Sequence, residues 1–214
     1  MRGMDGMSLW TAASLASTLA MWVGMMAAMM LPSALPMLRV VGAASRNAAA
    51  RGEESSPPAM TALGYLAAWF AFSVVATVVQ TALRQRAMLS PDLALVDARV
   101  GAGLVVAAGL YQFTPLKGAC LSRCRSPFTL MLDGWRNGYS GALRMGVEQG
   151  LYCVACCWAL MLVLFVAGVM NPMWVLLLAA AIAAEKLAPG DRWPRRTLGV
   201  ALLASGAVMA WSAV

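Results

Sequence analysis

The chain has 214 residues, of which 61% are hydrophobic and only 12% are charged. These proportions exclude an ordinary soluble domain, in which about a quarter of the residues are charged, and favour an integral membrane protein. The net charge of +7 comes from 16 basic residues that are spread through the segments between apolar runs, so it indicates membrane topology rather than nucleic-acid binding.

Apolar runs divide the whole chain, and we expect one all-α membrane domain over residues 1–214. An apolar helix of about 20 residues crosses the roughly 30 Å core of a bilayer, which predicts a bundle of about six transmembrane helices. Residues 41–59 are predicted to be a flexible loop, and residues 115–144 a cytoplasmic loop that contains cysteines. The expected spans are residues 9–31, 60–83, 96–114, 146–170, 172–188 and 198–213.

The first span carries rows of methionines and meets two prolines. Met26 and Met30 are one helical turn apart and form one row, and Met29 belongs to a parallel row. Pro32 and Pro36 are expected to kink or end the helix and to free backbone carbonyls. A thioether row that meets a broken helix suits an entry path for Cu(I). The alternative is that these methionines only fill irregular gaps between packed helices.

Two other spans carry polar residues to which we assign no metal role. The span 60–83 contains Gly64 and Tyr65, and its small residues suit close helix packing. The span 172–188 contains Glu185 and Lys186 near its far end. There the lysine can extend toward the membrane surface, and the glutamate either pairs with it or faces the bundle.

The span 146–170 contains three cysteines within five residues. Cys153 and the pair Cys156 and Cys157 fall on one helical face with Gln149. The chain has 5 cysteines and 17 methionines but no histidine, which a zinc or Cu(II) site normally uses. Glu148 stands beside this face, where a carboxylate is unfavourable unless it is paired, protonated or bound to a cation. The face therefore predicts a soft-metal site.

A second pair of cysteines precedes this span. Cys120 and Cys124 are four residues apart, a spacing that allows two thiolates on one helical turn to chelate a metal, or to form a disulfide after distortion. The neighbouring Lys117, Arg123 and Arg125 favour the thiolate forms. We predict a cytoplasmic docking pair.

Basic residues also predict an orientation. With six spans, alternate connecting segments hold 12 basic residues on one side of the membrane and 4 on the other. The more basic side faces the cytoplasm, which places both termini outside. We expect the residues that then lie toward the cytoplasm to form one cluster that opens inward. They are Pro32, Pro36, Met37, Tyr111, Cys120, Cys124, Glu148 and Glu185, with Cys153, Cys156 and Cys157 deeper in the membrane.

Three stretches of sequence together resemble a known family. They are Met25–Met37, Tyr111–Lys117 with the cysteines that follow it, and Gly150–Met161. They are similar to the bacterial predicted metal-binding integral membrane proteins of the domain of unknown function family 2182, sometimes labelled copper chaperones, over nearly the whole chain. The resemblance implies a multi-pass protein of the bacterial inner (plasma) membrane with a metal role. Other members carry a histidine just before the glycine that corresponds to Gly150. This chain has Gln149 there, and since an amide is a poor ligand for Cu(I), a site here must use sulfur.

The function we expect is Cu(I) binding and delivery, with the bilayer and a metal donor or acceptor protein, or a larger membrane complex, as partners. One alternative is a membrane thiol–disulfide redox protein, and another is a non-catalytic scaffold subunit of a membrane complex. We expect no enzyme activity and no catalytic residue, because the sequence has no histidine for a catalytic triad, no phosphate-binding glycine loop and no paired carboxylates. The predicted metal ligands are Cys153, Cys156 and Cys157 as the principal site, Met26, Met29 and Met30 as a relay, Cys120 and Cys124 as the docking pair, and Glu148.

Overall fold

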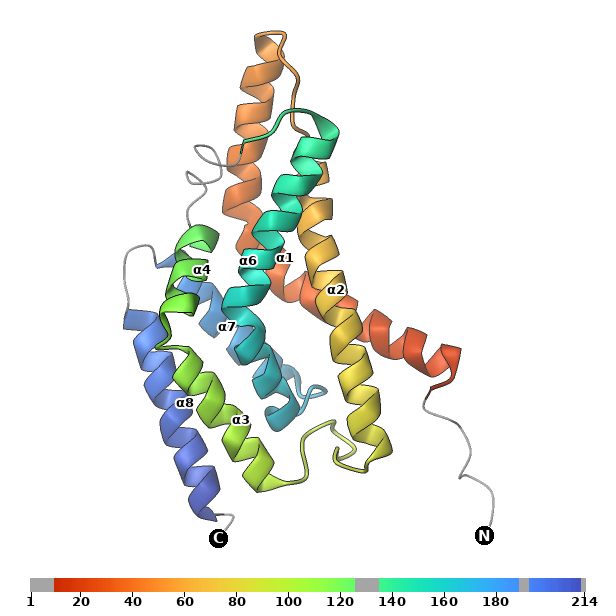
Figure 1. Cartoon of the computed structure of the whole chain (residues 1–214), viewed down its shortest axis with the longest axis vertical. Coiled ribbons are helices and arrows are strands. Elements are labelled where there is room, and N and C mark those ends of the chain that lie inside the picture. Colours follow the sequence, from red (N-terminus) through yellow and green to blue (C-terminus); the bar gives the residue numbers. More distant parts are fainter. Residues whose placement is uncertain (1–9, 126–134, 189–192, 213–214) are drawn as a thin grey trace.

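A computed structural model describes residues 10–125, 135–188 and 193–212. It confirms the all-α class: the described residues form seven helices and no strand (Figure 1). The helices are α1 (Ala12–Ala50), α2 (Pro58–Gln85), α3 (Ala98–Tyr111), α4 (Pro115–Arg125), α6 (Gly138–Ala167), α7 (Pro172–Leu187) and α8 (Trp193–Ser212).

The prediction of six spans is wrong. By length and apolar composition, α1, α2 and α6 can each cross a membrane, and α3 with α4, bent by 65° at their junction, adds a fourth if the pair is one span. Helix α7 has 16 residues, which at 1.5 Å per residue reach only about 24 Å, less than a bilayer core. Helix α8 has 20 residues, but its first turn contains Pro194, Arg195 and Arg196, and it is less apolar than a span.

Helix α1 is longer than predicted and runs through both prolines, with a change of direction along its length (Figure 1). Side chains supply hydrogen bonds in the proline-containing stretch, because the Met30 carbonyl accepts from the Ser33 hydroxyl at 2.8 Å and from the Tyr65 hydroxyl at 3.3 Å. The flexible loop expected over residues 41–59 therefore begins only after Ala50. The segment before Ala50 is rich in alanine, the best helix former, so it forms a helix without any apolar periodicity.

The loop expected over residues 115–144 is helical at both ends. Helix α4 occupies its first part, and α6 begins at Gly138, so only Trp135, Arg136 and Asn137 lie between helices among the described residues of this segment. Residues 126–134 lie outside the described part of the chain. Helix α4 packs against α6, which brings its cysteines to the cysteine-bearing helix (Figure 1).

Helices α2 and α6 approach backbone to backbone. A Cβ on Gly146 would collide with the Thr61 carbonyl, and one on Gly64 would collide with the Leu143 carbonyl. Gly150 follows Gly146 by four residues and also faces α2. This spacing of small residues is the pattern that lets membrane helices pack closely. The contact fixes where α6 stands relative to α2.

Away from this glycine contact, large side chains from α1, α2 and α6 fill the core. Trp22 is fully buried, and its ring lies 5.4 Å from that of Phe165 on α6. Its indole N–H donates to the side-chain oxygen of Gln80 on α2 at 2.8 Å. The buried amide of Gln80 therefore has a partner, and these contacts join the three long helices in one core.

Candidate metal centre

Three cysteine sulfurs from two helices converge. Cys124 lies near the end of α4, while Cys153 and Cys156 are one turn apart on α6. Their Sγ atoms all lie within 4.8 Å of one another, with Cys153 and Cys156 buried and Cys124 half-buried. With metal–sulfur bonds of about 2.3 Å, a trigonal metal holds its sulfurs about 4 Å apart, so small side-chain rotations bring the three to bonding distance. The donor set fits one soft metal ion.

The sulfur of Cys153 has two further polar neighbours. The Tyr65 hydroxyl lies 3.0 Å from Cys153 Sγ, and Lys186 Nζ on α7 donates to the same sulfur at 2.9 Å. Lys186 Nζ also donates to Ser33 Oγ at 2.8 Å and lies 3.8 Å from Met30 Sδ. Cys153 is therefore the meeting point of α1, α2, α6 and α7. The ammonium favours negative charge on its sulfur.

Cys157 is next to the three-sulfur group but does not belong to it. Its Sγ lies 3.2 Å from that of Cys156, whose thiol donates to the Cys153 carbonyl at 3.1 Å. All five cysteines of the chain are free thiols. The structure therefore brings together Cys153 and Cys156 of the predicted principal site. The third cysteine of the group is Cys124 from α4, whereas the sequence predicted Cys157.

A buried ion pair holds the helix end that carries Lys186. Lys117 Nζ on α4 lies 2.8 Å from Glu185 Oε2 and donates a hydrogen bond to Oε1 at 3.1 Å. The side chains of Lys117 and Glu185 are 0% and 1% exposed, so this pair is shielded from solvent. It joins the last turn of α7 to α4 and thereby sets the position of the next residue, Lys186.

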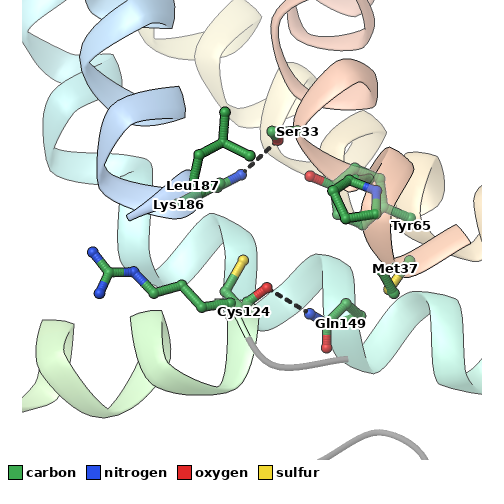
Figure 2. A pocket seen from close by; sticks show the side chains of 10 residues that line it. Ser33, Met37, Tyr65, Cys124, Gln149, Lys186 and Leu187 are labelled. Atoms are coloured by element: carbon green, nitrogen blue, oxygen red, sulfur yellow. Dashed lines mark hydrogen bonds between the residues drawn. The ribbon is translucent and has the colours of Figure 1, made fainter. Parts of the chain in front are cut away.

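A cavity of about 190 Å³ opens beside this group (Figure 2). Cys124, Gln149 and Lys186 line it from α4, α6 and α7. The Gln149 amide donates to the Cys124 carbonyl at 3.3 Å and so fixes the end of α4 against α6 (Figure 2). The remaining lining residues are Ser33, Ala34, Pro36, Met37, Tyr65, Arg125 and Leu187. The cavity gives a small ligand an approach to Cys124 that is lined by both polar and apolar groups.

Two predicted ligands lie away from the three sulfurs. Cys120 is buried on α4 but is not part of the group. Glu148 is 39% exposed and contacts two arginines, Arg144 at 3.1 Å and Arg136 at 3.7 Å. The partners of the Glu148 carboxylate in the structure are therefore the guanidinium groups of these two arginines.

The predicted methionine relay lies along α1. Met26 and Met30 are fully buried, and Met29 packs half-buried against the same core. Met30 is the member nearest the sulfur group through its contact with Lys186. Met37, which the sequence did not single out as a ligand, lines the cavity together with Cys124. A ligand role for any of these thioethers stays a prediction.

Sequence reasoning missed Lys186, Tyr65 and Ser33 as neighbours of the site. Lys186 was expected to extend toward the membrane surface, and the span that contains Tyr65 was given no chemistry. The signal that pointed to Lys186 was a pair of adjacent charges inside an apolar run, where an ionisable residue is a candidate functional group. Tyr65 and Ser33 carried no comparable signal.

Comparison with known proteins gives one result. No curated protein and no solved structure matches the chain. A family model described as PpoB2, copper chaperone, matches residues 19–209. That range contains the three converging cysteines and Lys186, and it agrees with the resemblance drawn from the sequence. The chain therefore belongs to the PpoB2 family of copper chaperones.

Proposed function

We propose that the chain is a membrane protein that binds Cu(I) through Cys124, Cys153 and Cys156 and delivers it to an acceptor. The observation that carries the proposal is the convergence of three cysteine sulfurs within 4.8 Å of one another. They come from α4 and α6, and the site exists only when these helices are packed. In this proposal copper is cargo, and the chain is not an enzyme.

The chemistry of the donors supports Cu(I) over other metals. Thiolate and thioether ligands are soft and select Cu(I), whereas Cu(II) sites normally use nitrogen or oxygen donors. Zinc also binds thiolates, but its structural sites use four ligands in a tetrahedron. The group offers three sulfurs within 4.8 Å of one another, Cys157 lies next to Cys156 but outside the group, and the carboxylate of Glu185 is held by Lys117.

Features along α1 support a transfer route. Met26 and Met30 form a buried row, and Met37 lines the cavity beside Cys124. Cu(I) moves between sites by ligand exchange, which needs only two or three sulfur donors at each step. We propose that copper moves between the methionine row and the cysteines, and that an acceptor protein or membrane complex receives it.

A membrane location is part of the proposal. Helices α1, α2 and α6 have the length and apolar composition of spans. Their exposed side chains include Phe70, Val75 and Leu151, which are unfavourable in water and suited to lipid. We propose that the protein resides in the inner (plasma) membrane, with the orientation that the basic residues predict.

A second candidate function is thiol–disulfide exchange. Cys124 lies beside Cys153 and Cys156, so these thiols are close enough for oxidation to pair two of them after side-chain rotation. Formation of such a disulfide from two thiols would release two electrons and two protons to an external acceptor. This candidate leaves the methionine row without a role.

The test is the metal content of the reduced, purified protein after loading with Cu(I) and removal of excess copper. We expect about one tightly held copper per chain in the wild type and almost none in a Cys124→Ser, Cys153→Ser, Cys156→Ser triple variant. Cys120→Ser is the matched control, because Cys120 is a buried thiol on the same helix as Cys124 but outside the group.

Negligible copper in the wild type would refute the proposal. Equal copper in the wild type and the triple variant would place the metal elsewhere. Thiol counts on the protein as isolated, without added reductant, separate the redox candidate, since a stable disulfide among these cysteines would remove two alkylatable thiols.

A further inference from the structure

We infer that Lys186 determines the metal selectivity of the three-sulfur site by disfavouring divalent ions relative to Cu(I). The inference rests on the proposed function, because it requires a metal at Cys124, Cys153 and Cys156. It concerns a residue that supplies no ligand and acts through its charge alone.

The ammonium group of Lys186 is fixed next to the metal position. It donates to Cys153 Sγ at 2.9 Å and to Ser33 Oγ at 2.8 Å, and it lies 3.8 Å from Met30 Sδ. The residue is only 8% exposed. A metal bonded to Cys153 Sγ at about 2.3 Å would therefore lie within roughly 5 Å of this charge.

Neighbouring residues do not cancel that charge. The adjacent carboxylate, Glu185, is already paired with Lys117 at 2.8 Å. The other hydrogen-bond partners of Lys186 Nζ, apart from Cys153 itself, are the hydroxyl of Ser33 and the thioether of Met30, which are neutral. Apart from the cysteines, the groups that bind Lys186 Nζ therefore leave its positive charge in place.

A fixed positive charge discriminates by the charge of the metal. Its repulsion is twice as large for a divalent ion as for a monovalent one at the same position. Thiolates act in the opposite sense, because they attract a divalent ion twice as strongly, and three of them alone would also serve Zn²⁺. Since the site is buried, salt screens the ammonium only weakly. Lys186 therefore shifts the balance toward Cu(I).

The experiment compares Cu(I) and Zn²⁺ affinities, each measured by competition with a coloured chelator, in the reduced full-length protein. Lys186→Gln removes the charge, keeps a hydrogen-bond donor and adds no sulfur, whereas Lys186→Arg keeps the charge and is the matched control. We expect Lys186→Gln to lower the ratio of Cu(I) to Zn²⁺ affinity by about tenfold or more, and Lys186→Arg to keep it within about threefold of the wild type. Lys186→Leu provides a second neutral variant if Lys186→Gln does not fold.

Each outcome bears on a different claim. A lowered ratio in the neutral variants alone supports the role of Lys186. A ratio that is unchanged or increased in those variants, while copper still binds, overturns this inference and leaves the proposed function intact. Failure of the wild type to bind copper overturns the proposed function and this inference with it.

Discussion

Two consecutive stretches of α6 pack in opposite ways. Around Gly146 and Gly150 the helix touches α2 backbone to backbone, with no room for a side chain. One turn later, at Cys153 and Cys156, it contacts other helices through sulfur, a hydroxyl and an ammonium group. The glycine stretch contributes position, and the cysteine stretch contributes chemistry.

The difference shows how a flexible donor set acquires a fixed geometry. Cysteine side chains rotate easily, so their mutual distances depend on where the helices stand. The glycine contact fixes α6 against α2, and the Lys117–Glu185 pair joins α4 to α7. The three sulfurs lie between these two anchors, and weakening either anchor should disturb the site from a distance.

The largest expected effect comes from breaking the ionic anchor. Glu185→Ala leaves Lys117 buried without its partner, which should lower the free energy of unfolding by about 3–5 kcal/mol. Thermal denaturation of the purified protein in detergent measures this loss. A Lys117→Met, Glu185→Leu double variant should recover most of the stability, because it removes both charges of the buried pair together. Equal losses in the single and double variants would show that the pair acts through packing rather than charge.

Breaking the glycine anchor should have a smaller effect. In Gly146→Ala the added methyl group meets the Thr61 backbone, and the helices must separate, which should lower the free energy of unfolding by about 1–3 kcal/mol. Gly103→Ala in α3 is the control, since nothing lies within 4 Å of its Cβ position, and it should be neutral or stabilising. The same thermal denaturation compares the two variants. Similar melting temperatures for both would contradict the close contact.

The smallest effect is expected at Glu148, which lies between Gly146 and Gly150 in sequence but contacts arginines. Glu148→Gln removes only partly exposed contacts with arginine, so stability should change by less than about 1 kcal/mol. Copper content after loading should match that of the wild type, because the carboxylate lies apart from the sulfurs. A clear loss of copper would instead support the ligand role predicted from the sequence.

Elements were easier to predict than their lengths. The apolar runs located α2 and the apolar part of α6 well, because long apolar segments have a strong signal, but α6 begins earlier than predicted, at Gly138. The same reasoning ended the first helix near Pro32 and missed α4, because it treated proline and polar composition as helix breakers. In the structure, α1 continues through Pro32 and Pro36, and Ser33 and Tyr65 supply hydrogen bonds to the backbone there.

The type of donor atom at the site could be predicted from the sequence, but only some of the residues that form the site could. Cys153 and Cys156 follow from helical periodicity, since they lie one turn apart on a single helix. Cys124 was expected to pair with Cys120, its neighbour in sequence, but packing of α4 on α6 turns it toward Cys153. Local spacing cannot show which face of one helix meets another.

By itself, the sequence determined that the protein is helical and apolar, that its candidate metal ligands are soft sulfur atoms without imidazole, and that it resembles a metal-binding membrane family. These properties depend on composition and on contacts within single helices, which the chain carries locally. The tertiary structure alone decided that Cys124 joins Cys153 and Cys156, and that Lys186 lies against their sulfur. Those neighbours come from helices far apart in sequence, and close packing at Gly146 and the buried Lys117–Glu185 pair set the distances between them.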